Sequence, residues 1–313
     1  MLKNKSIAVV IPALNEEVKI KSVIQSIPDF VDKVFVVNDG STDNTAKVAS
    51  EAHAIVISHK ENRGVGLAFK TGVEAVLNGD FDVMVNMDGD GQFNPEDIVK
   101  LVDPIVNDEA DFVTASRFKD NALIPDMPKA KLWGNKNMSR FISWMTKQKF
   151  YDVSCGFRAY NRLALLKLNL FGDFTYTQES FIDLAFKNVR IMEIPVEVRG
   201  VREHGKSRVA SNLFRYAVQT FKIILRTYRD YKPLRLFGYF ALFSFIITLI
   251  LGGFFIVHYI NTGYFSPHKW AGFVSGFFFV VSLVLVMMGF ILDMFARMRQ
   301  NQEKILYELK KDK

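Results

Sequence analysis

Two long stretches without any Lys, Arg, Asp or Glu constrain this chain more than any other feature. They are Leu236–Ile260, with 25 residues, and Trp270–Leu292, with 23. About 20 apolar residues are enough to cross the hydrocarbon core of a bilayer. Neither stretch shows the amphipathic spacing of a helix that packs one face on a soluble core, so a pair of buried soluble helices is the less favoured alternative. The sequence predicts a transmembrane hairpin over 236–293.

The Lys and Arg residues on either side of the hairpin predict its orientation. Both flanks, Tyr228–Arg235 and Arg297–Lys313, are rich in these residues, whereas the linker Asn261–Lys269 holds a single Lys. Cytoplasmic loops carry the excess of positive side chains in membrane proteins. We therefore expect an integral membrane protein in which residues 1–207 and a basic tail over 294–313 are cytoplasmic.

The formal net charge of +7 is concentrated in one segment. Arg199–Arg235 holds ten Lys or Arg and two acidic residues, a net of +8, which leaves 30 basic and 31 acidic residues elsewhere. Within it, the apolar residues of Val209–Tyr231 recur at three- and four-residue steps, with most basic residues on the other side. This pattern predicts a basic amphipathic helix within 208–235 that lies in the membrane interface, or alternatively packs on the cytosolic domain. Its place beside a membrane span indicates lipid, not nucleic acid, as the partner.

Residues 1–207 show alternating strand and helix patterns. Short β-branched runs occur at Ile7–Ile11, Val34–Val37, Ala54–Ile57 and Val83–Met87. Helical patterns lie between them at Glu16–Ile27, Thr42–Glu51 and Val65–Leu77. This alternation predicts an α/β domain with a mostly parallel, doubly wound sheet and helices on both faces. The single cysteine, Cys155, excludes an intrachain disulfide and a Cys-based zinc site.

Polar loops follow all four predicted strands. They are Pro12–Glu16, Asn38–Ser41, His59–Gly66 and Asp88–Gln92. Ligands bind at the carboxyl ends of strands in such sheets, so the four loops predict one binding crevice. Gly64 opens a helix, where a phosphate can approach the backbone, although the run is neither a complete dinucleotide fingerprint nor a P-loop.

The loop whose residue pattern is most specific for a function is Asp88-x-Asp90-x-Gln92. Two carboxylates and an amide oxygen on an extended chain suit Mg²⁺ or Mn²⁺ bridging a diphosphate. An EF-hand is excluded because the twelfth position from Asp88 is Val99 instead of Glu. A solvated Asp-Gly turn is the structural alternative.

Several motifs together resemble a known family. Three segments look like the nucleotide-sugar site of glycosyltransferase family 2, which has the Rossmann-like GT-A fold: Val10–Glu17, Val37–Asp43 and Asp88–Gln92. Three others are similar to motifs of the polyprenyl-phosphate glycosyltransferases, including dolichyl-phosphate mannose and glucose synthases: Ser116-Arg117, Ser154–Arg158 and Arg202–Ser207.

The resemblance implies roles by position. The nucleotide-binding residues would be Pro12, Ala13, Asn15, Glu16, Asp39, Gly64 and Asp88. The ligands of Mg²⁺ or Mn²⁺ would be Asp88, Asp90 and Gln92. The residues facing the acceptor phosphate would be Arg117, Lys131, Asn135, Ser139, Arg202 and Lys206. The catalytic set would be Asp90, Arg117 and Arg202.

The reaction implied is an inverting, metal-dependent transfer of a sugar from a nucleotide sugar to a polyprenyl or dolichyl monophosphate at the cytoplasmic face of the membrane. Asn38-Asp39-Gly40-Ser41 departs from the Asp-Asp-Asn-Ser common in mannose synthases, which favours UDP-glucose or UDP-N-acetylglucosamine over GDP-mannose. Lys131 stands where Arg is usual, and Cys155 stands where Ser is frequent, so Cys155 is interpreted as a packing residue. Membrane lipids are expected partners, and a homo-oligomer is left open.

Two rival functions share parts of this pattern. A processive polysaccharide synthase would carry a Gln-x-x-Arg-Trp motif, which this sequence lacks. A non-catalytic membrane tether would not need the Asp88, Asp90 and Gln92 set. Outside the motif roles, we expect Arg158 to brace a loop by pairing with Glu179 or Asp152, and His59 to be structural or solvent-facing.

Overall fold

The computed structural model describes residues 2–170, 176–199 and 213–311. It divides into two compact units, one of residues 1–224 with 307–313 and one of residues 225–306. Arg202 and Lys206, both expected near the diphosphate or the acceptor, lie outside the described residues.

A seven-stranded sheet forms the centre of the first unit, in the order β3-β2-β1-β4-β6-β5-β7. Its strands are β1 Ile7–Ala13, β2 Lys33–Asn38, β3 Ile55–Ser58, β4 Val83–Asn86, β5 Phe112–Ser116, β6 Arg158–Asn161 and β7 Ile191–Pro195. The four strands expected from the sequence are confirmed as β1 to β4, and they pair in parallel. β6 runs antiparallel to both β4 and β5, so β5 and its parallel neighbour β7 run in the direction of β4.

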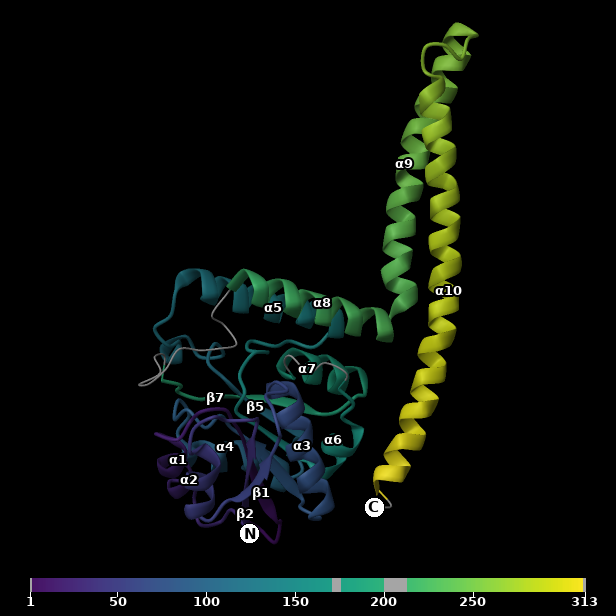
Figure 1. The fold of residues 1–313 in the computed structure, drawn as a ribbon. Coiled ribbons are helices and arrows are strands. Elements are labelled where there is room, and N and C mark those ends of the chain that lie inside the picture. Colours follow the sequence, from purple (N-terminus) through teal and green to yellow (C-terminus); the bar gives the residue numbers. More distant parts are fainter. Residues whose placement is uncertain (1, 171–175, 200–212, 312–313) are drawn as a thin grey trace. The chain divides into compact units, whose positions relative to one another are not determined.

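Helices cover both faces of this sheet, as predicted (Figure 1). On one face, β1 residues such as Ile7 pack with Ile20 of α1 and Leu101 of α4 in the main hydrophobic core. On the other, α3 approaches so closely that a Cβ on its Gly72 would lie 2.3 Å from a methyl carbon of Val10. The helices of this unit that precede residue 200 are α1 Ile20–Gln25, α2 Thr45–Glu51, α3 Val65–Asn78, α4 Ile98–Val106, α5 Lys129–Thr146, α6 Arg162–Lys167 and α7 Thr177–Phe186.

The first helix begins four residues later than the expected Glu16. Asn15 has a left-handed φ of 54°, and its side-chain oxygen accepts the backbone N–H of Thr42 at 2.8 Å. The side-chain amide thereby ties the chain to the next loop in a conformation that a helix cannot adopt. Residues 16–19 therefore remain a turn, and the polar segment after β1 stays at the edge of the sheet.

Two long apolar helices dominate the second unit. α9 spans Pro233–Thr262 and α10 spans Lys269–Lys311, and each contains a window apolar and long enough to cross a membrane. They cover the expected spans 236–260 and 270–292. Hydroxyls join them: Ser275 donates to the carbonyl of Thr248 at 3.0 Å, and Ser282 to that of Ala241 at 3.1 Å. Small hydroxyl residues between helices are typical of packing in lipid.

The expected segments around this hairpin are also helical. α8 spans Leu213–Tyr231, and the preceding residues 208–212 lie outside the described part of the chain. The basic stretch over 294–313 is the continuation of α10 as far as Lys311.

Candidate active site

The loops after β1 and β2 are joined by hydrogen bonds at the carboxyl edge of the sheet. The N–H of Asp39 donates to the carbonyl of Ala13 at 2.9 Å, and the N–H of Asn15 donates to the hydroxyl of Ser41 at 2.9 Å. The N–H of Glu16 donates to Thr45 Oγ1 at 2.8 Å. The first two of the loops expected to bind the nucleotide are therefore connected by hydrogen bonds.

Asp39 extends these connections to the loop after β3. Its Oδ1 accepts the backbone N–H of Arg63 at 3.0 Å, and its Oδ2 accepts that of Gly64 at 2.8 Å. Nδ1 of His59 lies 2.8 Å from Asp39 Oδ1, and Nε2 lies 3.0 Å from the Thr71 hydroxyl. His59 is thus structural, as expected. The carboxylate of Asp39 organises the glycine loop in addition to any contact with a nucleotide.

Gly40 allows this close approach of two loops. Its φ is +71°, and a Cβ there would lie 2.4 Å from the backbone carbon of Glu61. A side chain would be both strained in this left-handed conformation and in collision with a backbone. The Asp-Gly pair after β2 therefore fixes the distance between the second and third loops.

The donor set after β4 fits a hard divalent cation. Asp88 and Asp90 supply carboxylates, and Asp90 is buried, with Oδ1 accepting the N–H of Gln92 at 3.0 Å. The amide nitrogen of Gln92 donates to the carbonyl of Arg199 at 2.9 Å, so its amide oxygen is the atom left to act as a ligand. Among the described residues, no group of three His, Cys, Asp or Glu gathers as a closed metal site.

Asp88 lies against the loop that precedes β6. A Cβ on Gly156 would be 3.2 Å from Oδ1 of Asp88, 3.3 Å from its Oδ2 and 3.2 Å from the hydroxyl of Tyr176. Asn86, fully buried at the end of β4, donates to the Gly156 carbonyl at 2.9 Å and to the Tyr176 hydroxyl at 2.7 Å. These bonds hold the loop where its glycine leaves room for the carboxylate.

Gly156→Ala should therefore lower kcat about tenfold, because the added methyl group displaces Asp88 by a few tenths of an ångström from its place in the site. The thermal midpoint should change little, since the neighbouring side-chain oxygens need to shift by only a few tenths of an ångström. Steady-state transfer assays would measure the effect. Gly134→Ala is the matched control, because a Cβ there meets nothing within 4 Å. Wild-type kcat in Gly156→Ala would contradict this prediction.

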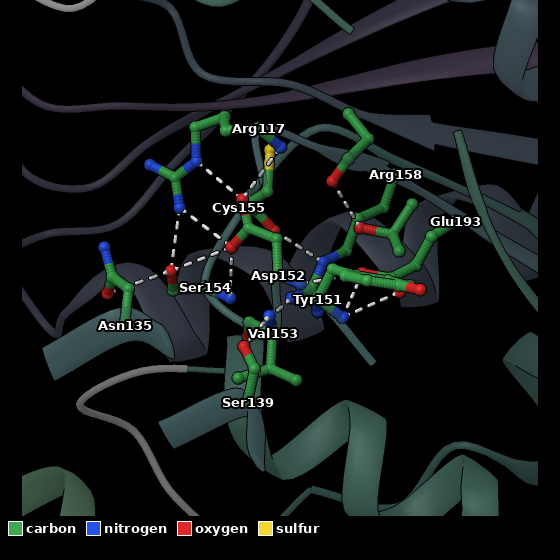
Figure 2. A network of polar contacts seen from close by, with 12 residues as sticks. Arg117, Asn135, Ser139, Tyr151, Asp152, Val153, Ser154, Cys155, Arg158 and Glu193 are labelled. Atoms are coloured by element: carbon green, nitrogen blue, oxygen red, sulfur yellow. Dashed lines mark hydrogen bonds and ion pairs between the residues drawn. The ribbon is translucent and has the colours of Figure 1, made fainter. Parts of the chain in front are cut away.

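A second polar network lies at the end of β5 (Figure 2). Arg117 follows β5 directly, and its Nε and one terminal nitrogen donate to the two carboxylate oxygens of Asp152 at 2.6 and 2.9 Å. That terminal nitrogen also donates to Ser154 Oγ at 2.7 Å. Burial raises the pKa of Asp152, but the charge and hydrogen bonds of Arg117 outweigh it and hold this pKa below its usual range. The pair fixes both the loop before β6 and the guanidinium.

Helix α5 brings to this network further residues that are expected to face the acceptor phosphate. Ser154 Oγ donates to Asn135 Oδ1 at 3.3 Å, and the hydroxyl of Ser139 accepts the N–H of Val153 at 3.4 Å. Figure 2 shows Asn135 beside Ser154 and Ser139 next to Val153. Lys131 stands one turn before Asn135 on the same helix and is half-buried. The structure thus gathers Arg117, Asn135 and Ser139 around one loop.

Arg158 braces this loop from inside the core. It is fully buried and lies against the aromatic rings of Phe112, Tyr176 and Phe181. It donates to the carbonyl oxygens of Cys155, Val153 and Thr177 and to the hydroxyl of Ser180. The bracing role is confirmed, but Asp152, one of the two expected partners, pairs with Arg117 instead. Burial raises the pKa of the Cys155 thiol to about 12, which agrees with a packing residue.

Glu193 was not singled out from the sequence, and Asp152 was expected to pair with Arg158 instead of Arg117. Glu193 is the single charged residue of β7, and its carboxylate accepts the backbone N–H groups of Tyr151 and Asp152 at 2.9 and 2.8 Å. A signal existed for Glu193, because an acidic residue at an inward position of an otherwise apolar strand needs a buried partner.

The family model of glycosyl transferase family 2 matches residues 8–168, just over half of the chain, and includes every loop described above. The chain belongs to glycosyl transferase family 2. Its mostly parallel sheet, with helices on both faces, is the GT-A fold that the motifs predict.

Two curated relatives carry informative names. The chain is 34% identical over 187 residues to the UDP-N-acetylglucosamine–dolichyl-phosphate N-acetylglucosaminyltransferase of Methanococcus voltae, covering 54% of this chain and 74% of the relative. It is 27% identical over 227 residues to the polyprenol monophosphomannose synthase of Mycolicibacterium smegmatis, covering 69% and 84%.

A solved structure supports the fold of this family 2 glycosyltransferase. Glucosyl-3-phosphoglycerate synthase of Mycobacterium tuberculosis, in complex with Mn²⁺, UDP-glucose and phosphoglyceric acid, superimposes with a TM-score of 0.59. The match covers 72% of this chain and 80% of that one at 23% sequence identity.

Proposed function

We propose that this enzyme transfers a sugar from a nucleoside diphosphate to a polyprenyl or dolichyl monophosphate at the cytoplasmic face of a membrane, with Mg²⁺ or Mn²⁺ and with inversion at the anomeric carbon. One observation carries the proposal. The loop Asp152–Gly156 holds Arg117 at one end and lies against Asp88 at the other. A cation suited to an acceptor phosphate and an acid suited to a metal–diphosphate are thereby held in one site.

The acceptor chemistry explains why cations matter more here than a base. A phosphate monoester has a second pKa near 6, so it is largely dianionic at neutral pH and is already a nucleophile. The site must bring this anion to an anionic donor, which requires positive charge in a fixed place. The guanidinium of Arg117 is fixed by Asp152, and its planar shape matches phosphate. Lys131, Arg202 and Lys206 are proposed to add charge on the acceptor side.

The nucleotide-sugar donor is proposed to bind to the four loops that follow β1 to β4. Backbone groups of Pro12–Glu16, Asp39 and the Gly64 loop would receive the nucleotide, and Asp88, Asp90 and Gln92 would hold the metal. When bound, the metal neutralises charge that develops on the departing nucleoside diphosphate. A UDP-sugar is favoured by Asn38-Asp39-Gly40-Ser41 and by the name of the Methanococcus relative. GDP-mannose is the second candidate, because another relative is named a polyprenol monophosphomannose synthase.

A lipid acceptor fits the exposed surfaces of two helices. On α5, the helix of Asn135 and Ser139, the large side chains of Trp133, Phe141 and Trp144 are exposed. On α8, Val218, Phe221 and Leu225 are exposed at helical spacing, as are Lys222 and Arg226. Aromatic and basic side chains of this kind favour the headgroup region of a bilayer. Together with α9 and α10 as membrane spans, they support a membrane lipid as the acceptor.

Purified full-length protein, a polyprenyl phosphate, Mg²⁺ or Mn²⁺ and a panel of radiolabelled UDP- and GDP-sugars would test the proposal. Labelled lipid should form with one donor, and chelation of the metal should stop its formation. NMR of the product should show an inverted anomeric configuration. Absence of transfer from every donor would reject the function, and a retained configuration would reject the inverting reaction.

A further inference from the structure

Glu193 contacts the acceptor half of the site from its buried side. It is 7% exposed and stands opposite Thr114 in the parallel pairing of β7 with β5, the strand that ends just before Arg117. Its Oε1 accepts the N–H of Asp152 at 2.8 Å and that of Tyr151 at 3.1 Å, while Oε2 accepts the N–H of Tyr151 at 2.9 Å. The carboxylate therefore fixes the backbone of the very residue that holds the Arg117 guanidinium (Figure 2).

We propose that Glu193 is a positioning residue for the acceptor phosphate: its carboxylate clamps the amides of Tyr151 and Asp152, and through the Asp152 side chain it sets the position of Arg117. This inference rests on the proposed function, in which Arg117 meets that phosphate. The chain of contacts is short and direct. It runs from Glu193 to the Asp152 N–H, and from the Asp152 carboxylate to two nitrogens of Arg117.

A negative charge at Glu193 is needed for the complete clamp. A neutral Gln would keep one accepting oxygen but would turn an N–H₂ group toward the N–H of Tyr151, where two donors cannot bond. Hydrogen bonds to a charged acceptor are also the stronger ones. An uncharged side chain at position 193 should therefore leave the Tyr151–Asp152 backbone, and with it Arg117, less firmly placed.

The charged groups around Glu193 make this clamp sensitive to pH. Burial raises the pKa of Glu193 to about 7, and the neighbouring Asp152 carboxylate adds to the rise. The N–H groups of Asp152 and Tyr151 oppose it, as does Lys119, whose ammonium donates to the Glu193 carbonyl at 2.6 Å. Above pH 7 both oxygens accept hydrogen bonds. Below it, one oxygen carries a proton and the clamp weakens, so the KM for the acceptor should rise as the pH falls through about 7.

The test is a pH series from 6 to 8.5 on the full-length enzyme, measuring kcat and the KM of each substrate for the wild type, Glu193→Gln and Glu197→Gln. Glu197 is the matched control, because it is an exposed acid four residues further along the same segment. Glu193→Gln should raise the KM for polyprenyl phosphate at pH 8 about 5- to 10-fold, the loss of one good hydrogen bond. The KM for the nucleotide sugar and kcat should change less than about twofold.

The pH dependence separates positioning from a general structural effect. The second ionisation of the acceptor phosphate contributes to every profile equally, so the difference between the wild type and Glu193→Gln isolates Glu193. That difference should be large at pH 8 and small at pH 6, where the wild type is itself protonated. Equal profiles in the two proteins would overturn the inference, as would parallel changes in both KM values.

A second variant tests the inference in case Glu193→Gln folds poorly. Glu193→Asp keeps the charge but withdraws it by one methylene, so it should raise the acceptor KM and retain the pH dependence. A wild-type acceptor KM in this variant would also overturn the inference. Failure of the wild type to transfer any sugar is a different result, because it would reject the proposed function itself.

Discussion

Asp90→Asn should reduce sugar transfer by about 1,000-fold or more, while the metal-free protein keeps its thermal midpoint. Asn preserves the size of the side chain and the oxygen that accepts the N–H of Gln92. It removes the charge that would hold the divalent cation. A cation on a leaving diphosphate stabilises the transition state by several kcal/mol, and about 4 kcal/mol corresponds to roughly 1,000-fold in rate.

Two measurements together define this result. Radiolabelled transfer to polyprenyl phosphate gives kcat, and thermal unfolding with UDP gives the stabilisation that Mn²⁺ adds, which should disappear in Asp90→Asn. Asp97→Asn is the matched control, because Asp97 is equally buried but pairs with Lys100 one turn further along. Full activity of Asp90→Asn, or an unchanged Mn²⁺ effect, would remove Asp90 from the proposed metal site.

Arg117→Met should have the largest effect on stability, about 3–5 kcal/mol at pH 7, because it leaves the fully buried carboxylate of Asp152 without its cation. For a domain of this size the thermal midpoint should fall by roughly 6–20 °C. Transfer should be lost as well, since the guanidinium proposed to meet the acceptor phosphate is gone. The double variant Arg117→Met with Asp152→Asn should recover much of the stability and none of the transfer.

The pH dependence of this loss follows from the lowered pKa of Asp152. In the wild type the ion pair stabilises the fold above the unfolded pKa, near 3.9, and this contribution is lost as the pH falls through the lower folded pKa. In Arg117→Met the unpaired carboxylate has a raised pKa and destabilises the fold at neutral pH. The difference in thermal midpoint between the wild type and Arg117→Met should therefore be large at pH 7–8 and decrease toward pH 4. A difference that is constant with pH would show that packing, not charge, causes the loss.

The parts of the fold that the sequence predicts well are those in which one local pattern decides the structure. Apolar runs followed by polar loops located β1 to β4, and uncharged runs located α9 and α10. The strands from β5 onward were not predicted. β6, for example, begins with the buried cation Arg158, whose hydrogen-bond partners include the Thr177 carbonyl and the Ser180 hydroxyl, 19 and 22 residues further along the chain. No local pattern in the sequence predicts such a strand or its antiparallel direction.

In the candidate site, too, residues within a local motif are found from the sequence and residues that act through distant contacts are not. The acids after β4 and the Asp-Gly turn after β2 are found because each lies in a short motif at a strand end. Glu193, and the pairing of Asp152 with Arg117, are missed because each depends on a contact between residues that are 41 and 35 positions apart. Motifs also do not reveal how atoms are used: Asp39 is expected on the nucleotide, yet both of its oxygens bind the backbone of the next loop.

The reversed direction of β6 has a consequence for how such enzymes can diversify. Because β6 enters the sheet from the carboxyl edge of its neighbours, the residues before it, not those after it, reach the site. Under the proposed function, the donor half is then encoded within the first 92 residues, and the acceptor half by the later segment from Arg117 to Lys206. Exchange of that later segment between relatives should redirect the enzyme to a new acceptor while leaving its choice of nucleotide sugar intact.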